Sequence, residues 1–294
     1  MDGFAPSDKK GNYERPKGLT FDNNFKNNLN INKSFYLLIG STCPWCHRTL
    51  IVYKLKNLSK KINIIYLKPN YENGEWIFDE KFYGSKKLSD IYKKANKTDI
   101  LRATVPILIE AKNNKLEVIS NESSEIVKIL FFLSNKDQKK INKYAIHYSK
   151  YLEIIHQDIN DGVYKCGFAR NQIAYKNASK RLFESLKKVD QLIKKTEGPW
   201  ILGEDITYAD IFLFPTMIRW ELIYSKLFKC TEREISDFKN IIKWRLKFFA
   251  LSNISKTCFD SEWKQDYYKA LFPLNPNQII PVLPSLEEIM RLKH

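Results

Sequence analysis

Residues 35–58 read FYLLIGSTCPWCHRTLIVYKLKNL, and at their centre is the run Cys43-Pro44-Trp45-Cys46-His47-Arg48. Residues 35–39 are aliphatic and aromatic and end at Gly40, which predicts a buried strand. Residues 44–58 predict a helix. Pro44 suits its first turn, because that turn leaves amide hydrogens unpaired and proline has none. Cys43 is therefore expected at the start of a helix.

A cysteine at the start of a helix ionises more easily than a free one. Unpaired backbone amides and the positive end of the helix dipole favour a thiolate, so we expect the pKa of the Cys43 thiol to lie below the free value of about 8.5. His47 and Arg48 add positive charge nearby. The sequence therefore predicts a nucleophilic sulfur at neutral pH.

The length and composition indicate a two-domain protein of a reducing compartment. The chain has 294 residues, of which 44% are hydrophobic, enough for two ordinary cores. No apolar run approaches the roughly 18 residues that span a bilayer, and residues 1–33 contain no hydrophobic signal region. The five cysteines lack the paired spacing of a secreted disulfide framework. We expect a cytoplasmic protein that does not associate with membranes.

The net charge of +16 raises the question of nucleic-acid binding. The lysines are spread along the whole chain between Asn, Asp, Glu and Ile, and no helix-turn-helix, zinc-finger or aromatic RNA-binding motif accompanies them. A dispersed basic charge favours solubility and attraction of anionic small molecules. We expect no nucleic-acid partner.

Three parts follow one another along the chain. Residues 1–32 are polar and predict an extended arm, residues 33–134 predict an α/β domain, and residues 138–294 predict an all-helical domain with a Pro-rich tail. In the α/β domain we expect strands at 35–39 and 62–67, a polar segment containing Trp76, and a helix at about 86–96. A hairpin of strands 107–110 and 116–119 and a helix at 122–133 complete it. This order is thioredoxin-like, with the first two strands parallel.

The second half changes to a period of 3.6 residues, which predicts helices at roughly 138–160, 170–195, 207–227 and 234–250. Thr207 and Asp210 have the spacing of an N-terminal capping box, a structural role. The proline-rich residues 275–284 predict an extended strip.

A thioredoxin-like domain followed by a helical one is the layout of the glutathione transferases, and the chain more specifically resembles the glutathionyl-hydroquinone reductases, or Xi-class transferases. The resemblance covers residues 33–284 and is carried by separate motifs in the same order. They are CPWCHRTL at 43–50, GEWIF at 74–78, TVP at 104–106, NESSE at 121–125, NDGVYKCGFA at 160–169, ADI at 209–211, RW at 219–220, YY at 267–268, NP at 275–276 and PV at 281–282.

The resemblance implies an enzyme that uses glutathione as co-substrate, needs no metal, acts on an aromatic glutathionyl-hydroquinone and forms a homodimer. Cys43 would be the nucleophile. Tyr164, together with Tyr267 or Tyr268, would bind the hydroquinone oxygen and protonate a ring carbon. Since the chain has 16 tyrosines, any one of these could instead be a packing residue.

The residues that would bind glutathione also have simpler readings. Val105 would pair with the cysteinyl unit of glutathione through its backbone, before a cis Pro106; an ordinary proline at a strand edge is the alternative. Ser123 and the amides of its helix suit a carboxylate, and Glu122 the ammonium group, while simple N-capping is the alternative for both. Trp76 would stack near glutathione or the aromatic product, unless it only covers the sheet edge.

Two departures from the family pattern bear on the mechanism. Cys46 stands where relatives usually carry alanine, and the N-terminal arm is shortened. Cys46 could be a resolving thiol that attacks a mixed disulfide at Cys43, or a buried small residue. A zinc site would need a second Cys or His pair, which the sequence lacks.

We therefore expect reduction of glutathionyl-hydroquinones to hydroquinones through a mixed disulfide of Cys43 with glutathione. One rival is a glutaredoxin-like, omega-type thiol transferase or dehydroascorbate reductase that uses the Cys43/Cys46 pair. A rival of another class is a non-catalytic glutathione-fold interaction module, against which the intact Cys43 motif argues.

Overall fold

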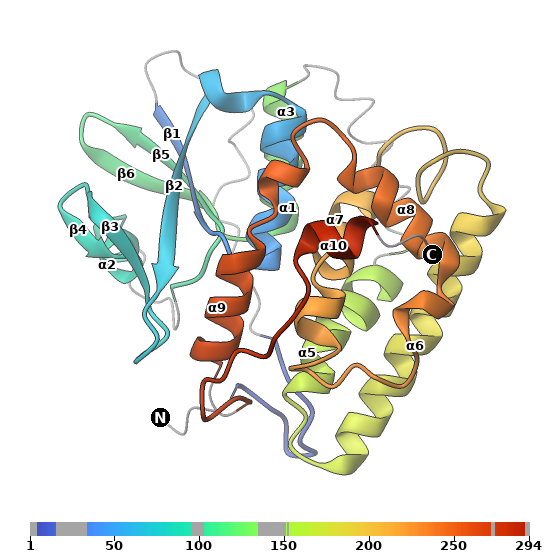
Figure 1. Ribbon diagram of the computed structural model, residues 1–294. Helices are drawn as coiled ribbons and strands as arrows, with labels where there is room; N and C mark the ends of the chain where they lie inside the picture. The colour runs from blue at the N-terminus through green and yellow to red at the C-terminus, as the bar shows by residue number, and fades with distance from the viewer. Residues whose placement is uncertain are drawn as a thin grey trace. The chain divides into compact units, whose positions relative to one another are not determined.

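The computed structural model describes residues 5–15, 34–95, 103–134, 151, 153–271 and 274–291. Contacts within the chain divide it into two compact units. One comprises Lys17–Gln138, and the other joins Met1–Pro16 to Lys139–His294. We call them the α/β unit and the helical unit. Figure 1 shows the strands, from blue to green, in the first and the yellow to red helices in the second.

A mixed sheet forms the centre of the α/β unit. Its strands lie in the order β4-β3-β2-β1-β5-β6. β1 and β2 are parallel, with Phe35 opposite Ile62, and the other neighbouring pairs are antiparallel. The strand bounds are β1 Ser34–Gly40, β2 Ile62–Pro69, β3 Trp76–Phe82, β4 Ser85–Lys87, β5 Ile107–Lys112 and β6 Lys115–Ser120.

Helices cover this sheet and bury its central strands. α1 (Pro44–Leu55) packs against α3 (Ser123–Ser134), whereas α2 (Leu88–Lys94) contacts β3, β4 and β6. A short 3₁₀ turn, η2 (Leu58–Lys60), follows α1. In β1, Leu37, Leu38 and Ile39 are wholly buried, as expected for an apolar run in the middle of a covered sheet. The thioredoxin-like fold predicted from the sequence is confirmed.

Two strands of this unit were not predicted from the sequence. The segment expected to be a polar excursion forms β3 and β4, and the following helix begins at Leu88 rather than near residue 86. β4 is the edge strand and β3 lies next to it. Their exposed residues are all charged, so neither strand shows a long apolar run. By contrast, the hairpin was predicted correctly, and Asn113 and Asn114 adopt the positive φ values of a tight hairpin turn.

The helical unit consists of α-helices interrupted by short π and 3₁₀ turns. In chain order they are η3 Glu153–Asn160, α5 Asp161–Gly167, α6 Gln172–Lys195, α7 Tyr208–Met217, η4 Trp220–Tyr224, η5 Ile235–Asp237, α8 Lys239–Phe249, η6 Ser255–Thr257, α9 Asp260–Ala270 and α10 Leu286–Arg291. η3 and η4 are π-helical. η3 contacts α5, α6 and α7, so it lies at the centre of this unit.

The predicted helices agree only in part with these elements. Those at 170–195 and 234–250 correspond to α6 and α8, and the one at 207–227 is divided into α7 and η4. Residues 138–150 lie outside the described residues. The helices α5, α9 and α10 were not predicted. Short helices with few apolar positions give little periodicity, which explains the omissions.

The capping box that the sequence predicted is present at the start of α7. The Asp210 carboxylate accepts hydrogen bonds from the backbone amide and hydroxyl of Thr207, at 2.8 and 2.9 Å. It also accepts from the Ile201 amide at 3.0 Å and from Trp244 Nε1 at 2.8 Å. Burial raises the pKa of this carboxyl group. Asp210 therefore ties α7 to two neighbouring segments.

Residues 5–15 of the arm are folded onto the helical unit. A bridge joins Ser7 to Tyr13. The Arg170 amide donates to the Gly11 carbonyl at 3.0 Å, and the Asn171 side chain donates to the Lys10 carbonyl at 2.9 Å. This part of the arm thus turns back on itself rather than being simply extended. At the other end of the chain, residues 279–285 have no regular structure, and Val282 is fully exposed.

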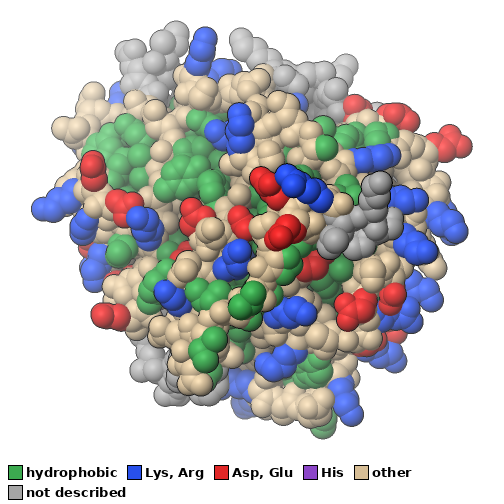
Figure 2. All heavy atoms as spheres, viewed as in Figure 1, with side chains coloured by type: hydrophobic (Ala, Val, Ile, Leu, Met, Phe, Trp, Pro, Cys, Tyr) green, Lys and Arg blue, Asp and Glu red, His purple; other side chains and the backbone are tan. Residues whose placement is uncertain are grey.

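Charged side chains of both signs are mixed on the surface. Figure 2 shows Lys and Arg side chains scattered among Asp and Glu over the viewed face rather than gathered in one patch. Among the described residues, no helix has both the length and the apolar composition needed to cross a membrane.

The two glycines of α5 provide a test of its packing. A Cβ atom at Gly167 would lie 2.6 Å from Phe228 Cγ, whereas at Gly162 the nearest atom, Leu182 Cδ1, is 3.4 Å away. We expect Gly167→Ala to lower the free energy of unfolding by about 1–3 kcal/mol, because overpacking forces neighbours to shift. Gly162→Ala should change it by less than about 1 kcal/mol. Urea unfolding followed by circular dichroism measures both, and equal stabilities would contradict the packing described here.

Candidate active site

Cys43 lies where the sequence placed it, immediately before α1. Its amide donates to the Gly40 carbonyl at the end of β1, at 3.1 Å, and its carbonyl accepts from the His47 amide at 3.0 Å. Pro44 is the first residue of the helix. The Cys43 side chain is only partly buried and makes no capping hydrogen bond. The strand and the helix thus fix the backbone of Cys43, a residue that is only partly buried.

The loop before β5 lies next to this sulfur. The Cys43 thiol donates to the Val105 carbonyl at 3.7 Å. The peptide bond between Val105 and Pro106 is cis, as the sequence predicted. Tyr92 accepts a hydrogen bond from Asn121 and donates one to the Thr104 carbonyl, both at 3.0 Å, and so holds the start of the same loop. The structure therefore brings together Cys43, Val105 and Pro106.

Glu122 and Ser123 lie at the start of α3, but their side chains already have partners. A Glu122 carboxylate oxygen accepts from the Ser124 amide at 3.1 Å and from the Ser124 hydroxyl at 3.2 Å. The Ser123 hydroxyl donates to the same oxygen at 3.4 Å. Glu122 thus makes N-capping contacts, which were the alternative to ligand binding in the sequence analysis.

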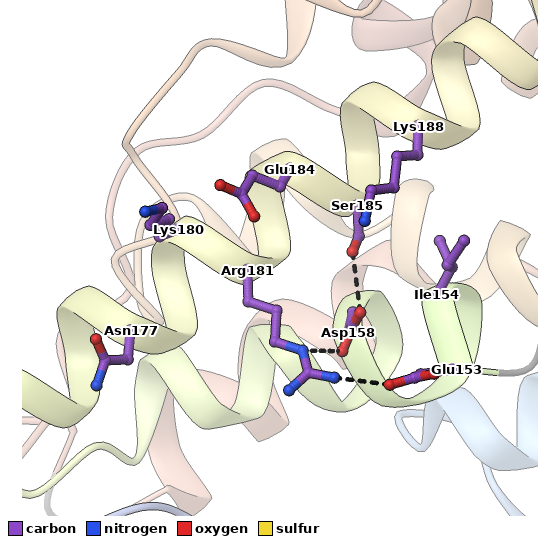
Figure 3. Close-up of a pocket in the computed structure, with 9 residues that line it drawn as sticks. All are labelled: Glu153, Ile154, Asp158, Asn177, Lys180, Arg181, Glu184, Ser185 and Lys188. Carbon is purple, nitrogen blue, oxygen red and sulfur yellow. Dashed lines mark hydrogen bonds and ion pairs between the residues drawn. The ribbon is translucent and has the colours of Figure 1, made fainter.

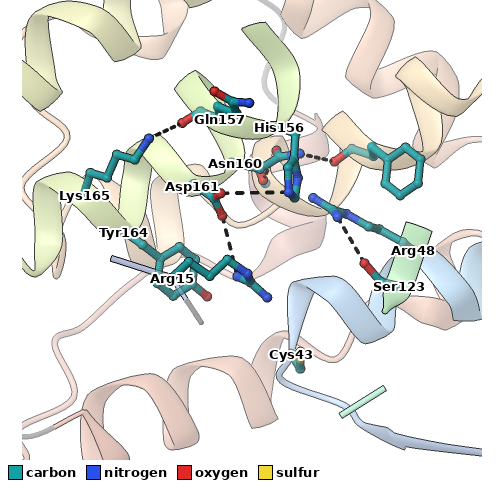
Figure 4. A network of polar contacts seen from close by, with 12 residues as sticks. Arg15, Cys43, Arg48, Ser123, His156, Gln157, Asn160, Asp161, Tyr164 and Lys165 are labelled. Atoms are coloured by element: carbon teal, nitrogen blue, oxygen red, sulfur yellow. Dashed lines mark hydrogen bonds and ion pairs between the residues drawn. The ribbon is translucent and has the colours of Figure 1, made fainter. Parts of the chain in front are cut away.

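Arg48 connects α1 to this helix start, a role that was not predicted. Arg48 is 2% exposed, and its guanidinium group donates to the Ser123 hydroxyl at 3.2 Å (Figure 4). It also lies 5.5 Å from the centre of the Trp45 ring, a cation–π distance. Arginine is almost never fully buried unless it is paired. The sequence showed the charge of Arg48 but not its partner, 75 residues further along the chain.

Cys46 is on the buried side of α1. It is 1% exposed, and its sulfur accepts a hydrogen bond from the Gly40 amide at 3.4 Å. His47, one residue further, is 2% exposed. These surroundings favour the reading of Cys46 as a small packed residue.

Trp76 lies at the edge of the sheet near the end of β1. It is the first residue of β3 and is paired with Pro69 of β2. A Cβ atom added to Gly40 would lie 2.3 Å from Trp76 Cζ3, so the indole ring lies directly over that glycine. Since Gly40 also binds the Cys43 amide, Trp76 covers the sheet edge within the same loop region.

The helical unit contains a chain of hydrogen-bonded tyrosines. Tyr164 of α5 and Tyr267 of α9 have their hydroxyl oxygens 2.7 Å apart, and Tyr224 of η4 lies 3.2 Å from the Tyr267 hydroxyl. Burial, helped by Tyr224, raises the pKa of Tyr267 well above its ordinary value. Tyr267 therefore keeps its proton near neutral pH.

Of the two adjacent tyrosines in α9, only Tyr267 is bonded to Tyr164. The Tyr268 hydroxyl donates to the Leu222 carbonyl at 3.0 Å, and burial raises the pKa of Tyr268 to about 12. Tyr224 was not predicted, because no motif marks it. A helix presents consecutive residues about 100° apart, which explains why only one of the pair faces Tyr164.

Aromatic rings surround the Tyr164 side chain. Its ring centre is 5.1 Å from that of Phe228, 6.2 Å from Phe168 and 6.3 Å from Tyr13 of the arm. One helical turn before Tyr164, Asp161 lies 3.6 Å from Arg15 and 3.9 Å from His156 (Figure 4). These contacts tie α5 to Arg15 of the arm and to His156 of η3.

A hollow of about 470 Å³ between η3 and α6 is less suited to be the site. Figure 3 shows Arg181 reaching across it to two carboxylates, at 2.6 Å from Asp158 and 2.9 Å from Glu153. Ser185 donates to the second Asp158 oxygen at 3.1 Å. The Asp158 carboxylate in this hollow is thus already paired. None of the predicted site residues lines the hollow. Among the described residues, no cluster of three or more His, Cys, Asp or Glu side chains is placed to hold a metal ion.

Comparison with known proteins gives relatives that match both units. Residues 42–130 match the glutathione S-transferase N-terminal domain, and residues 172–246 match the C-terminal domain. The glutathionyl-hydroquinone reductase YqjG of Escherichia coli is 31% identical over 264 residues, which cover 85% of this chain and 79% of that protein. The glutathionyl-hydroquinone reductase PcpF of Sphingobium chlorophenolicum is 31% identical over 263 residues, covering 85% of this chain and 83% of that protein.

Solved structures agree with these relatives. The glutathione-bound structure of YqjG has a TM-score of 0.74, covering 86% of each chain at 31% identity. The glutathione S-transferase Xi of Phanerochaete chrysosporium has a TM-score of 0.82 at 27% identity, covering 92% of this chain and 97% of its own. The chain therefore belongs to the glutathione S-transferase family, within the glutathionyl-hydroquinone reductases of the Xi class.

Proposed function

We propose that this protein reduces glutathionyl-hydroquinones to hydroquinones with Cys43 as its nucleophile. The observation that carries the proposal is the setting of Cys43, at the start of a buried helix and beside the carbonyl that precedes a cis proline. This setting suits a thiol that must meet a second sulfur. The named activity of the two reductases that are 31% identical supports the choice of substrate.

Glutathione is the co-substrate, and residues of the α/β unit would bind it. The Val105 backbone would pair with its cysteinyl unit, and the first amides of α3, with Ser123, would bind the γ-glutamyl carboxylate. Glu122 would accept the ammonium group with the carboxylate oxygen that α3 does not use. Trp76 would close the site over Gly40. A relative whose structure contains glutathione supports the choice of this co-substrate.

The first step transfers glutathione to the enzyme. The Cys43 thiolate attacks the sulfur of the substrate, a disulfide forms between Cys43 and glutathione, and the bond from that sulfur to the ring carbon breaks. The electron pair of the broken bond goes to the ring carbon, which takes a proton and leaves as part of the hydroquinone. A glutathione thiolate then attacks the mixed disulfide, which frees Cys43 and yields glutathione disulfide.

The proton for the ring carbon would come from the tyrosine chain of the helical unit. Tyr267 is protonated near neutral pH because burial raises its pKa, and its hydroxyl is bonded to that of Tyr164. Tyr164 would donate to the carbon, with Tyr267 and Tyr224 supporting its hydroxyl. A buried hydroxyl pair suits both the oxygen and the apolar ring of a hydroquinone.

Two further properties are part of the proposal. We infer that the protein acts in the cytoplasm, where glutathione keeps thiols reduced, and that it is a homodimer, as glutathione transferases commonly are. Sedimentation at several protein concentrations tests the second inference.

Cys43→Ser tests the nucleophile. A serine oxygen cannot form the mixed disulfide, so we expect turnover of glutathionyl-menadiol to fall by more than about a thousandfold. Product chromatography measures it in the presence of excess glutathione. Retained turnover in Cys43→Ser would remove the mechanism.

Cys46→Ala is the matched variant on the same helix. It should keep turnover within about threefold, since glutathione itself resolves the mixed disulfide and alanine fits the buried site. A small glutathione mixed disulfide should be reduced equally well by this variant. A large loss on both substrates would instead favour the glutaredoxin-like rival.

The neighbours Tyr267 and Tyr268 provide a second test. Tyr164→Phe and Tyr267→Phe should each slow the first turnover by about a hundredfold or more, the usual contribution of a positioned acid. Tyr268→Phe should slow it by less than about threefold, because its hydroxyl bonds only a backbone carbonyl in the structure. Rapid-quench measurement of hydroquinone release reports this step. Equal effects at the two adjacent positions would rule out the assignment.

Arg48→Met tests how the glutathione site is held. Without the guanidinium group the Ser123 hydroxyl loses a partner, and we expect glutathione to bind about tenfold more weakly. Lys54→Met, in the last turn of the same helix, removes an equal charge and should leave binding unchanged. Calorimetric titration measures both, with circular dichroism to verify folding. Unchanged affinity in a folded Arg48→Met protein would show that Arg48 has only a packing role.

A further inference from the structure

A buried arginine that the proposed mechanism does not use lies between η4 and α9. Arg219 immediately precedes η4 and is 0% exposed. Its guanidinium group donates to the Pro215 carbonyl at 2.9 Å, and the central carbon of that group lies 3.8 Å from the centre of the Trp263 ring in α9. This is short for a cation–π contact, which extends to about 6 Å. A guanidinium group keeps its charge when buried, because its pKa exceeds about 12.

Arg219 contacts α9 one turn away from the hydroxyl contact between Tyr224 and Tyr267. Trp263 and Tyr267 are four residues apart in α9, so they lie on one face of that helix. Tyr224 follows Arg219 by five residues in the π-helical η4, which is the span of one π-helical hydrogen bond. η4 and α9 pack against each other. The two contacts are thus made by successive turns of the same two elements.

The positive charge of Arg219 acts on Tyr267. Burial raises the pKa of Tyr267, and Tyr224 raises it further, whereas Arg219 lowers it. A cation has this effect because it stabilises the phenolate relative to the phenol. Glu221 is the acidic residue of η4, and it is paired with Arg245, which donates to both of its carboxylate oxygens at 2.7 Å. The field of Arg219 is therefore directed at the tyrosine chain rather than used to neutralise Glu221.

We propose that Arg219 is a positioning residue for the reduction, which fixes η4 against α9 and stabilises the negative charge that the tyrosine chain acquires when Tyr164 gives up its proton. This role rests on the proposed function, in which Tyr164 protonates the ring carbon. After that step Tyr164 is a phenolate, and the Tyr267 hydroxyl, 2.7 Å away, donates a hydrogen bond to it. A fixed cation one turn further along stabilises this charge without any rearrangement during the reaction. Tyr164 regains a proton from solvent once the hydroquinone has left.

Two substrates separate this role from a merely structural one. Reduction of glutathionyl-menadiol requires a proton at a ring carbon, whereas thiol–disulfide exchange with a small glutathione mixed disulfide requires none there. Both reactions use Cys43 and the same glutathione site. A general loss of structure lowers both rates, but a defect in the tyrosine chain lowers only the first. The ratio of the two rates therefore reports the tyrosine chain alone.

Arg219→Gln removes the charge but keeps a donor for the Pro215 carbonyl. We expect single-turnover reduction of glutathionyl-menadiol to slow by about tenfold, because losing a nearby opposite charge weakens an acid by about one pKa unit. Reduction of the glutathione mixed disulfide should change by less than about twofold, since exchange at Cys43 needs no acid from the helical unit. Lys226→Met is the matched control. It removes an equal charge from an exposed side chain just after η4 and should leave both rates unchanged.

A double variant tests whether Arg219 acts through Tyr267. In Tyr267→Phe the phenol on which the charge acts is absent. Adding Arg219→Gln to that variant should therefore slow glutathionyl-menadiol reduction by less than about a further twofold. If the two substitutions instead multiply their separate effects, Arg219 acts by another route and the proposal is overturned.

Fluorine NMR tests the charge without reference to turnover. Difluorotyrosine is introduced at position 267 of the full-length protein, where its electron-withdrawing fluorine atoms make the phenol more acidic and report its ionisation. We expect the pKa at position 267 to be higher by about one unit in Arg219→Gln, because a stabilising cation has been removed from the phenolate. It should be the same in Lys226→Met as in the protein that carries both charges. An equal pKa with and without Arg219 overturns the proposal.

Circular dichroism verifies that each variant is folded. If Arg219→Gln does not fold, Trp263→Phe takes its place in both measurements, because a phenyl ring holds a cation less firmly than an indole ring, and a selective loss of about threefold is expected. Equal losses on the two substrates, or no loss on either, overturn the proposal. Wild-type protein that exchanges the mixed disulfide but does not reduce glutathionyl-menadiol counts against the proposed function, and the fluorine titration then still decides whether Arg219 acts on Tyr267.

Discussion

The position of Cys43 depends on the hydrogen bond from its amide to the Gly40 carbonyl, which joins the end of β1 to the start of α1. β1 is wholly buried in its second half, and nearly all of α1 is buried as well. Neither element can shift without exposing apolar surface, so the turn between them is held from both sides. A nucleophile on a flexible loop would lose orientation that these contacts provide in advance. Cys43 is thus carried by two of the most buried elements of its unit.

Much of this arrangement could be predicted from the sequence, because it depends on local signals. The apolar run before Gly40, the proline after Cys43 and the Asn113–Asn114 turn each have a short-range cause. The missed features depend on partners far along the chain. β3 is held by pairing with β2 and the edge strand β4 by pairing with β3, and Arg48 has its role only through Ser123. A sequence shows that a charged group is present but not which group accepts its hydrogen bonds.

The tyrosines are a second case in which the sequence does not show which groups are in contact. Tyr267 and Tyr268 are identical in type and adjacent, yet one contacts Tyr164 and the other binds a backbone carbonyl. The choice is made by the rotation of α9 against η4, which packs on it. Tyr224 becomes part of the hydroxyl chain through the same packing. Because η4 is π-helical rather than α-helical, a 3.6-residue period could not have indicated which of its side chains face Tyr267.

Burial also separates the cysteines by reactivity. A thiol must ionise to react, and removing it from water opposes ionisation. Cys43 is only partly buried at the start of α1, whereas Cys166 and Cys230 are 2% and 0% exposed. Of these three thiols, Cys43 is therefore the one placed to meet a second sulfur.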